Sequence, residues 1–452
     1  MARVVDVASS GTAGVLRGAP PLGSRTLLVC TAALFVLVLA GYANSLAGVF
    51  VLDDFSILKT EELHSLWPLW PCLFSQKMVT RPLVGLSLAL NYAVSGTHST
   101  LGYHIVNLAV HLLAALTLFG LVRQTLHAPR LAPRFAARAT PLALGVAALW
   151  AVHPLQTEAV TYIIQRSESM MGLFFLLTLY CAVRSFSAPD PLPWRAGAIA
   201  AALLGMGCKQ VMVTAPVLVW LHDRTFFAGS FRATARRWPL YLGLACSWIA
   251  LALLMASVDQ FHAAGFELEV SPQQYLLTQF GVIPRYLGLI LWPSDLSLHY
   301  AWPVARSATS VVPGLLLLTP LLLAIVVGSW RGTVLSYLWV WFFLILAPSS
   351  SILPIHDAVA EHRLYLSLAA PSALVVLGGY RLMARLWPRP ESADARTWSL
   401  FAALVAILIG ACALRTRARN EDYRDEARIC GGPSSSARSS GSPMRTLTTI
   451  SA

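Results

Sequence analysis

The sequence predicts an all-α polytopic membrane protein with about eleven transmembrane helices. Three observations support this. Of the 452 residues, 56% are hydrophobic and only 12% are charged, whereas ordinary soluble domains carry about 25% charged residues. In addition, the apolar residues form long runs separated by short basic clusters. A surplus of apolar residues this large requires lipid around the chain, so the length does not indicate roughly two or three soluble domains.

The net charge of +12 has a topological explanation. Arginine clusters lie between the apolar runs, as the positive-inside rule describes for cytoplasmic loops. We therefore expect the basic residues to orient the chain in the membrane and expect no nucleic acid partner. The seven cysteines include no C-x-x-C pair and no metal-ligand spacing, so they predict no disulfide framework.

The first predicted span opens the membrane domain. Residues 26–45 form an uncharged apolar run of the length that crosses a bilayer, about 20 residues. Arg3, Arg17 and Arg25 precede it, so residues 1–25 are expected to be a cytoplasmic tail and the loop after residue 45 to lie outside. A cleaved signal peptide is the alternative, but the long segment before the apolar run argues against it.

Ten further spans are predicted within a transmembrane domain that extends over residues 26–416. They lie at 104–122, 139–153, 168–185, 194–208, 211–222, 238–257, 311–329, 333–352, 364–384 and 398–416. Several are shorter than about 17 residues, which suggests broken spans. Two other apolar segments, 82–96 and 276–292, are interpreted as interfacial helices.

Polar residues gather at the predicted outer ends of the spans. An ionisable group inside a membrane costs about 2.5–3.5 kcal/mol on insertion scales, so such clusters suggest a functional site. The first is the adjacent pair Asp53 and Asp54, directly after the first span. One carboxylate of such a pair can have a raised pKa and act as a general base, or the pair can bind a metal ion. A solvated turn or a helix N-cap is the structural alternative.

Further polar clusters fall on the same predicted side. The segment 153–172 carries His153, Glu158, Arg166 and Glu168, and the segment 354–366 carries His356, Glu361, His362 and Arg363. Between them, Lys209 follows a predicted span, where it either binds phosphate or extends to the membrane surface. Arg81 precedes Pro82 as a loop cation or a plain helix start. The histidines 104 and 111 share a helix face with Asn107, which favours hydrogen bonding between helices.

Taken together, these segments resemble a known family. The matching pieces are FVLDDF (50–55), RPL with LNY (81–92), YHIVNLAVHLL (103–113), and the segments 153–180, 208–226, 278–287 and 361–369. They resemble the membrane glycosyltransferases of the GT-C fold, in particular transmembrane proteins with C-terminal tetratricopeptide repeats. That family includes animal O-mannosyltransferases and many bacterial members. The 153–180 stretch is the most specific and resembles the bacterial members.

The resemblance implies a GT-C-like bundle with outer-face loops and interfacial helices. It also implies inverting transfer of mannose or another hexose from a polyprenyl- or dolichyl-phosphate donor to a protein Ser or Thr hydroxyl. No cofactor is implied; the partners are the bilayer, the lipid-linked donor and the acceptor protein. The reaction would take place on the outer face of a bacterial inner membrane, or of the endoplasmic reticulum membrane in a eukaryote.

The resemblance also suggests roles for individual residues. Asp53 and Asp54 match the motif in which this fold places its catalytic acid. The donor phosphate and the substrate are then expected to contact Arg81, His153, Glu158, Arg166, Lys209, Glu361, His362 and Arg363. A metal ligand set is not part of this expectation.

Two departures from the family pattern bear on activity. Gln210 stands where the resemblance leads us to expect Glu, which removes a charge beside Lys209. Residues 417–429 resemble the family's lead-in to the repeats, but residues 430–452 are Ser- and Gly-rich and predict a disordered tail. We expect a shortened family member, impaired if the repeats hold the acceptor. A secondary transporter and a non-catalytic scaffold are the alternative functions.

Overall fold

The computed structural model describes residues 19–74, 78–97, 99–256, 270–355, 357–386 and 391–425. Every regular element in these ranges is a helix, which confirms the all-α prediction. The expectations for residues 1–18, for His356 and for the tail after residue 425 lie outside the described residues.

The first half of the chain forms ten α-helices. Their bounds are α1 (Ser24–Tyr42), α2 (Phe55–Lys59), α3 (Leu69–Phe74), α4 (Pro82–Ser95), α5 (Leu101–Leu126), α6 (Ala132–Phe135), α7 (Ala139–Ala151), α8 (Thr157–Thr161), α9 (Arg166–Ser185) and α10 (Leu192–Met206). Short 3-10 turns connect several of them, including η1 (Ala43–Ala47), η2 (Leu52–Asp54), η5 (Pro154–Gln156) and η6 (Ile163–Gln165).

The second half follows the same pattern. Its helices are α11 (Ala215–His222), α12 (Phe231–Thr234), α13 (Trp238–Ala256), α15 (Pro272–Leu291), α16 (Ala308–Trp330), α17 (Val334–Leu346), α18 (Leu364–Ser367), α19 (Ala369–Leu386) and α20 (Glu391–Asn420). A π-helix covers Asp223–Ala228, and the 3-10 turns include η7 (Gln210–Thr214), η10 (Glu361–Arg363) and η11 (Glu421–Arg424).

The number of full-length spans is smaller than predicted. Five helices of the described chain are long and apolar enough to cross a membrane: 24–47, 101–126, 231–256, 311–330 and 395–424. The count rises to at most seven if two bent pairs, 132–151 with 154–161 and 361–367 with 369–386, each form one span. These helices make the chain an integral membrane protein, but the prediction of about eleven spans needs correction.

Helix length explains the correction. The segments predicted at 194–208, 211–222 and 333–352 fold into helices of 15, 8 and 13 residues. At 1.5 Å per residue, a helix of 13 residues is about 20 Å long, short of the roughly 30 Å hydrocarbon core. Hydropathy reports only that these segments are apolar, and it does not register where each helix begins or ends.

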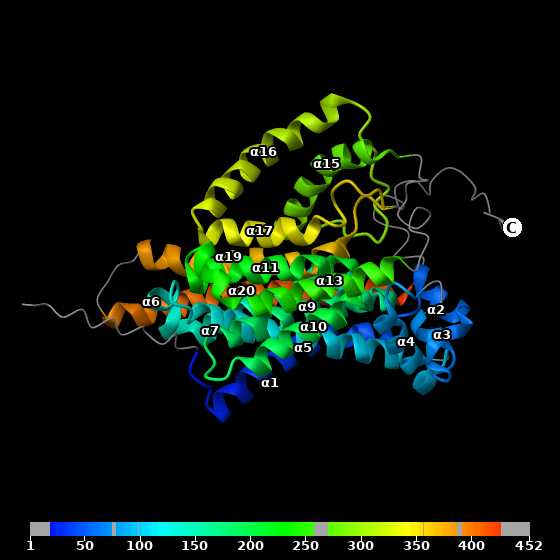
Figure 1. Cartoon of the computed structure of the whole chain (residues 1–452), viewed down its shortest axis with the longest axis horizontal. Helices are drawn as coiled ribbons and strands as arrows, with labels where there is room; N and C mark the ends of the chain where they lie inside the picture. Colours follow the sequence, from blue (N-terminus) through cyan, green and yellow to red (C-terminus); the bar gives the residue numbers. More distant parts are fainter. Residues whose placement is uncertain are drawn as a thin grey trace, which may run out of the picture.

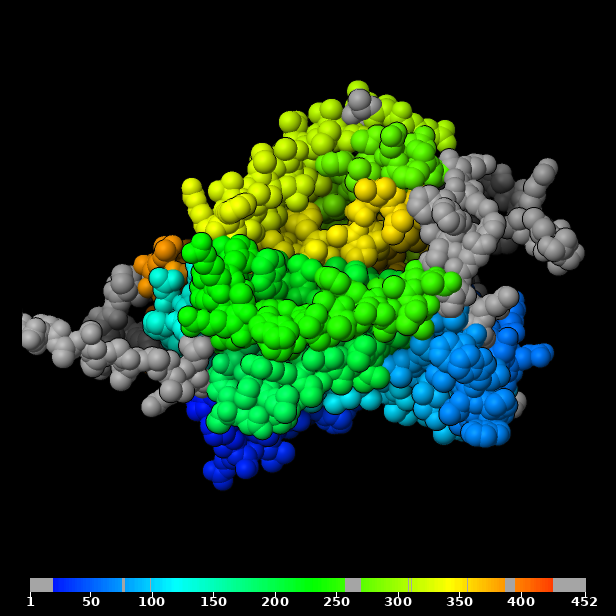
Figure 2. Space-filling model, viewed as in Figure 1, coloured from blue at the N-terminus to red at the C-terminus, as the bar shows by residue number. Residues whose placement is uncertain are grey.

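The main body is a bundle of roughly parallel helices that includes α5, α7, α9, α10 and α20 (Figure 1). Of these, α5, α7 and α9 are the most buried. Small residues allow close packing there, as is common between helices in membranes. At Gly172 in α9, a Cβ atom would lie 2.5 Å from the ring of Tyr365, so the approach of α9 to α18 requires glycine. Helices α15 and α16 rise from α17 as a separate layer, and Figure 2 shows the molecule hollowed beneath α16.

The two ends of the bundle differ in chemistry. Helices α1 and α20 finish at the same end, because Asn44 Nδ2 donates to Arg417 O at 2.8 Å and Asn420 Nδ2 donates to Gly41 O at 3.1 Å. This end carries α2 to α4 and the acidic pair, while α6 and its arginines lie at the other (Figure 1). The end that holds the acidic pair is the predicted outer face.

Candidate functional site

The acidic pair lies on a strained turn that sends its two side chains in different directions. Leu52 adopts φ of 43°, a left-handed conformation that is uncommon outside glycine. The following residue, Asp53, is exposed, whereas Asp54 is fully buried. Strain of this kind often marks functional segments. Asp53 therefore presents its carboxylate to the outer face, and Asp54 does not.

Both carboxyl oxygens of Asp54 accept hydrogen bonds from backbone N–H groups. Its Oδ1 accepts from the N–H of Ile164 at 2.7 Å, and its Oδ2 accepts from the N–H of Val51 at 3.2 Å. The N–H of Asp53 donates to the hydroxyl of Tyr162 at 2.9 Å. These bonds attach the turn to the segment between α8 and α9, so Asp54 positions the loop and Asp53 is the carboxylate open to a substrate.

The buried carboxyl of Asp54 predicts a pH dependence of stability. Burial raises the pKa of Asp54 from 3.8 to about 8, against the two backbone hydrogen bonds. The unfolded chain loses this proton near pH 4 and the folded chain holds it to about pH 8, so the stability from Asp54 is complete below pH 4 and falls across that window. Asp54→Asn should flatten the corresponding slope of the thermal unfolding midpoint. An unchanged slope would show that Asp54 ionises normally.

Glu158 and His362 form a buried pair although they are 204 residues apart in sequence. Glu158 Oε2 accepts from the backbone N–H of His362 at 2.8 Å, and Oε1 lies 2.6 Å from its Nδ1. An ionised carboxylate only accepts hydrogen bonds, so Nδ1 carries the proton. Burial lowers the pKa of His362, so the ring is neutral and its Nε2 is a hydrogen-bond acceptor. Among the described residues, Nε2 of His362 has no hydrogen-bond partner. The pair therefore orients the imidazole with Nε2 available to a substrate.

Lys209 is paired with Glu168, a contact that the sequence pattern does not predict. Its ammonium forms an ion pair with Glu168 of α9, which supplies the negative charge missing at Gln210. Burial lowers the pKa of Lys209, and Glu168 opposes that shift. The N–H of Leu83 donates to Gly207 O at 3.1 Å, which brings the segment of Arg81 against that of Lys209.

The separate clusters converge on one region. Lys209, Arg81 and Arg363 all lie within electrostatic range of His362, as does Glu168. Tyr162, which holds the Asp53 backbone, lies within the same range of Asp53, Asp54 and Glu158. The outer end of the bundle thus combines one exposed carboxylate with a group of cations.

Three predicted contact residues are instead held by backbone atoms. Buried Arg166 donates to Asn107 Oδ1 at 2.6 Å, to Tyr103 O at 2.9 Å and to Ser87 O at 3.1 Å. Arg363 donates to the carbonyls of residues 357, 358 and 349 at 2.5, 3.1 and 3.4 Å. His153 Nε2 donates to Ile290 O at 3.1 Å, and its Nδ1 accepts from Leu155 N at 3.3 Å.

The polar face of α5 serves helix packing. His111 lies 3.0 Å from the Tyr365 hydroxyl and 2.9 Å from Ala151 O, and His104 lies 3.2 Å from Gly48 O. Asn107 donates to Val160 O at 3.1 Å and accepts from Arg166. The prediction of interhelical hydrogen bonds is confirmed for His111 and Asn107, whereas His104 bonds to the loop at Gly48.

Glu361 belongs to a second buried polar group. Its Oε1 accepts from Tyr300 Oη at 2.5 Å and from Ser297 N at 2.7 Å, while its buried Oε2 has no partner among the described atoms. Buried Arg419 lies within electrostatic range of both Glu361 and Glu158, and it donates to Asp422 at 2.8 Å. Sequence reasoning missed Arg419 because it counted this segment as a lead-in outside the site.

The segment expected as a lead-in packs against the acidic turn. Asn420 Oδ1 accepts from Thr161 Oγ1 at 2.7 Å, and Tyr423 O accepts from Val49 N at 3.1 Å. The Tyr423 ring packs with Val51, whose N–H donates to Asp54, and with Tyr162, whose hydroxyl accepts from the Asp53 N–H. Residues 417–425 are therefore part of the membrane domain's outer end. In the described part of the chain, no group of three or more His, Cys, Asp or Glu side chains is arranged to hold a metal ion.

The known proteins described below, to which this chain is similar, are all animal protein O-mannosyl-transferases. Protein O-mannosyl-transferase Tmtc2 of Drosophila melanogaster is 28% identical over 310 residues, which cover 63% of this chain and 31% of that protein. The chain is similar to animal protein O-mannosyl-transferases. F38B6.6 of Caenorhabditis elegans is 26% identical over 64% of this chain and 41% of its own length, and human TMTC4 is 30% identical over 38% and 26%.

The sequence similarity covers only part of each relative. The matched regions span less than half the length of these relatives. They come from animals, so they do not support the expected bacterial type or a bacterial inner membrane. No family model matches the chain. No solved structure matches it either, so the GT-C fold stays a prediction.

Proposed function

We propose that this chain is a membrane glycosyltransferase that moves mannose or another hexose from a lipid-phosphate donor to a Ser or Thr hydroxyl of a protein. The observation that carries the proposal is the exposed Asp53 carboxylate at the end of the bundle where Arg81, Lys209 and His362 gather. The animal relatives are named protein O-mannosyl-transferases, which supports the reaction class. Their origin favours the endoplasmic reticulum membrane, with the reaction on the lumenal face.

Asp53 acts as the general base in this proposal. It accepts the proton of the acceptor hydroxyl as the oxygen attacks the anomeric carbon of the donor sugar. The bond from that carbon to the phosphate oxygen breaks on the opposite side, through an oxocarbenium-like state, so the configuration inverts. Asp54 and Tyr162 hold the turn so that the Asp53 carboxylate stays in place.

The cations receive the leaving group. Arg81 and Lys209 would contact the lipid phosphate as it takes the electron pair of the broken bond. Glu168 holds Lys209 before the donor binds, and Glu158 holds the ring of His362 so that Nε2 can accept a hydrogen bond from a hydroxyl of the substrate. Arg166, His153 and Arg363 position the surrounding backbone, and Glu361 holds the loop of Ser297 and Tyr300.

Removal of the Lys209 charge tests the phosphate assignment. Lys209→Met should lower kcat/KM for the lipid-linked donor by about 10- to 100-fold, since a hydrogen bond to a charged group contributes about 1.5–3 kcal/mol. The assay is hexose transfer to a Ser/Thr-containing acceptor protein in membranes that carry the chain. Lys59→Met, at an exposed lysine of the same outer face, is the matched control. Equal kcat/KM in the two variants would remove Lys209 from the donor site.

A further inference from the structure

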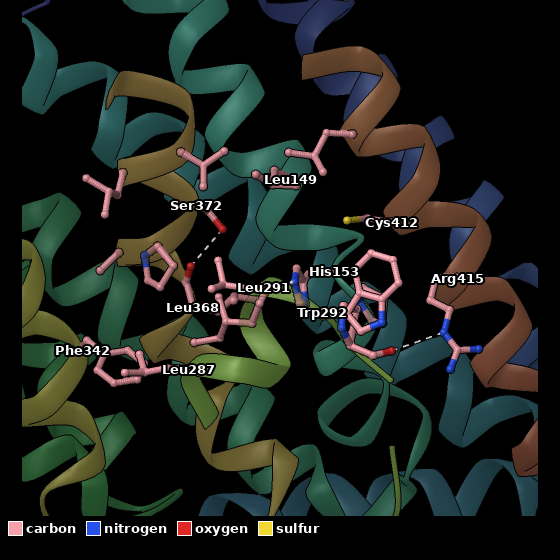
Figure 3. A pocket seen from close by; sticks show the side chains of 18 of the residues that line it. Leu149, His153, Leu287, Leu291, Trp292, Phe342, Leu368, Ser372, Cys412 and Arg415 are labelled. Atoms are coloured by element: carbon pink, nitrogen blue, oxygen red, sulfur yellow. Dashed lines mark hydrogen bonds between the residues drawn. The ribbon is translucent and has the colours of Figure 1, made fainter. Parts of the chain in front are cut away.

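A large apolar groove is lined by residues that do not include the cations described above. Its volume is about 890 Å³, near the upper end of the roughly 300–1,000 Å³ typical of small-molecule sites. The ends of α7 and α15 form part of its wall, and α17, α19 and α20 complete it (Figure 3). The lining is almost entirely hydrocarbon, with Leu149, Leu287, Phe342, Leu374 and Leu408 among its residues.

One end of the groove is polar and lies toward the outer face. Arg415 stands there on α20, one residue before Thr416, whose hydroxyl donates to Val152 O at 2.7 Å. The Arg415 side chain is exposed, and its Nε donates to Pro293 O at 3.4 Å (Figure 3). Within the described residues it has no acidic partner. Trp292, 77% exposed, lies beside it.

This arrangement matches an amphipathic lipid. Tryptophan and arginine at the end of an apolar surface are typical of the level of the lipid headgroups. An arginine whose remaining N–H groups are exposed is suited to a phosphate, which it can bind through two parallel hydrogen bonds. Charge complementarity favours a lipid with net negative charge over a zwitterionic one.

The groove is separate from the proposed reaction site. Of the ten residues assigned to that site, only His153 lines the groove. Both ring nitrogens of His153 are engaged, with Ile290 O and Leu155 N. In the proposed function the phosphate of the sugar donor lies beside Arg81 and Lys209, neither of which borders the groove, so the donor is not the occupant.

We propose that this groove binds an anionic phospholipid of the outer leaflet, with its acyl chains along α19 and α20 and its phosphate on Arg415. The lipid fills the space between α15 and the bundle. It thereby supports the loop after α15, whose Ser297 and Tyr300 hold Glu361. The binding claim does not depend on the transfer reaction, because it concerns a different set of residues.

Photo-labelling tests the occupant. The full chain is placed in vesicles of phosphatidylcholine that contain a trace of phosphatidylglycerol with a photoreactive acyl chain, and labelled peptides are identified by mass spectrometry. We expect label in the 368–375 and 408–415 segments, several-fold above that from photoreactive phosphatidylcholine. Arg415→Gln should reduce the phosphatidylglycerol label about tenfold, as expected for loss of a charged hydrogen bond.

Two further variants make the test decisive. Arg417→Gln is the matched control, because Arg417 is also exposed and donates to Ala40 O at 3.4 Å without lining the groove. Ala411→Phe fills the groove and should abolish the label even if the Arg415 variant folds poorly. Equal labelling by the two phospholipids, or equal loss in the Arg415 and Arg417 variants, would overturn the proposal. Preferential labelling by a photoreactive polyprenyl phosphate would overturn it as well, because the groove would then belong to the donor.

Discussion

Asp53→Asn should reduce sugar transfer by about 10²- to 10⁴-fold, the range that a positioned general base contributes. The asparagine keeps the size of the side chain but cannot accept the hydroxyl proton. Because Asp53 is exposed and only its backbone N–H is bonded to Tyr162, the folded protein should remain. The measurement is the initial rate of hexose transfer from the lipid-phosphate donor, normalised to folded protein.

Two companion variants separate catalysis from folding. Glu61→Gln removes another exposed carboxylate from the same loop and should leave the rate unchanged. Asp54→Asn disturbs the bonds to Ile164 and Val51, so it should lower the amount or stability of folded protein as well as the rate. A full rate in the Asp53 variant combined with a stable but inactive Asp54 variant would transfer the catalytic role to Asp54.

Arg166→Met should destabilise the folded protein by several kcal/mol, since each buried acceptor left without its donor costs about 1–3 kcal/mol. The methionine leaves Asn107 Oδ1 and the carbonyls of Tyr103 and Ser87 without their donor. Thermal unfolding of the detergent-solubilised chain measures the effect.

A second arginine of the same helix provides the control. Arg184 lies over the ring of Trp194 at 4.5 Å and is only half-buried, so Arg184→Met should change stability by about 1 kcal/mol or less. If Arg166→Met kept its stability and lost donor binding, Arg166 would be a phosphate ligand and the structural role assigned to it would be wrong.

The pattern of apolar runs predicts an all-helical membrane chain but overstates its spans. Residues 333–352 illustrate why: they are apolar on average, yet the helix covers only Val334–Leu346 before the chain turns. Mean hydropathy cannot distinguish a helix that crosses the membrane from a short helix enclosed by other helices. The bend at residues 152–153 directly precedes Pro154, which disfavours helical backbone at the residue before it, and His153 there bonds to Ile290 O.

The sequence predicts the polar residues of the site better than their roles. Convergence of Glu158, Lys209 and His362 is anticipated from their shared outer position. The choice between Asp53 and Asp54 as the exposed carboxylate could not be predicted from the sequence. It depends on the φ of Leu52 and on the bond of Asp54 to Ile164, which is more than a hundred residues away. Likewise, a buried arginine that binds carbonyls has the same sequence signature as one that binds phosphate.

The central claim is best tested by the modification state of acceptor proteins. Membranes that contain the wild-type chain, the Asp53→Asn variant or neither are supplied with a lipid-phosphate-linked hexose, and the proteins of the outer face are analysed by mass spectrometry. The proposed function predicts hexose on Ser or Thr peptides with the wild-type chain and none above background in the other two samples. Identical peptide patterns in all three samples would contradict it.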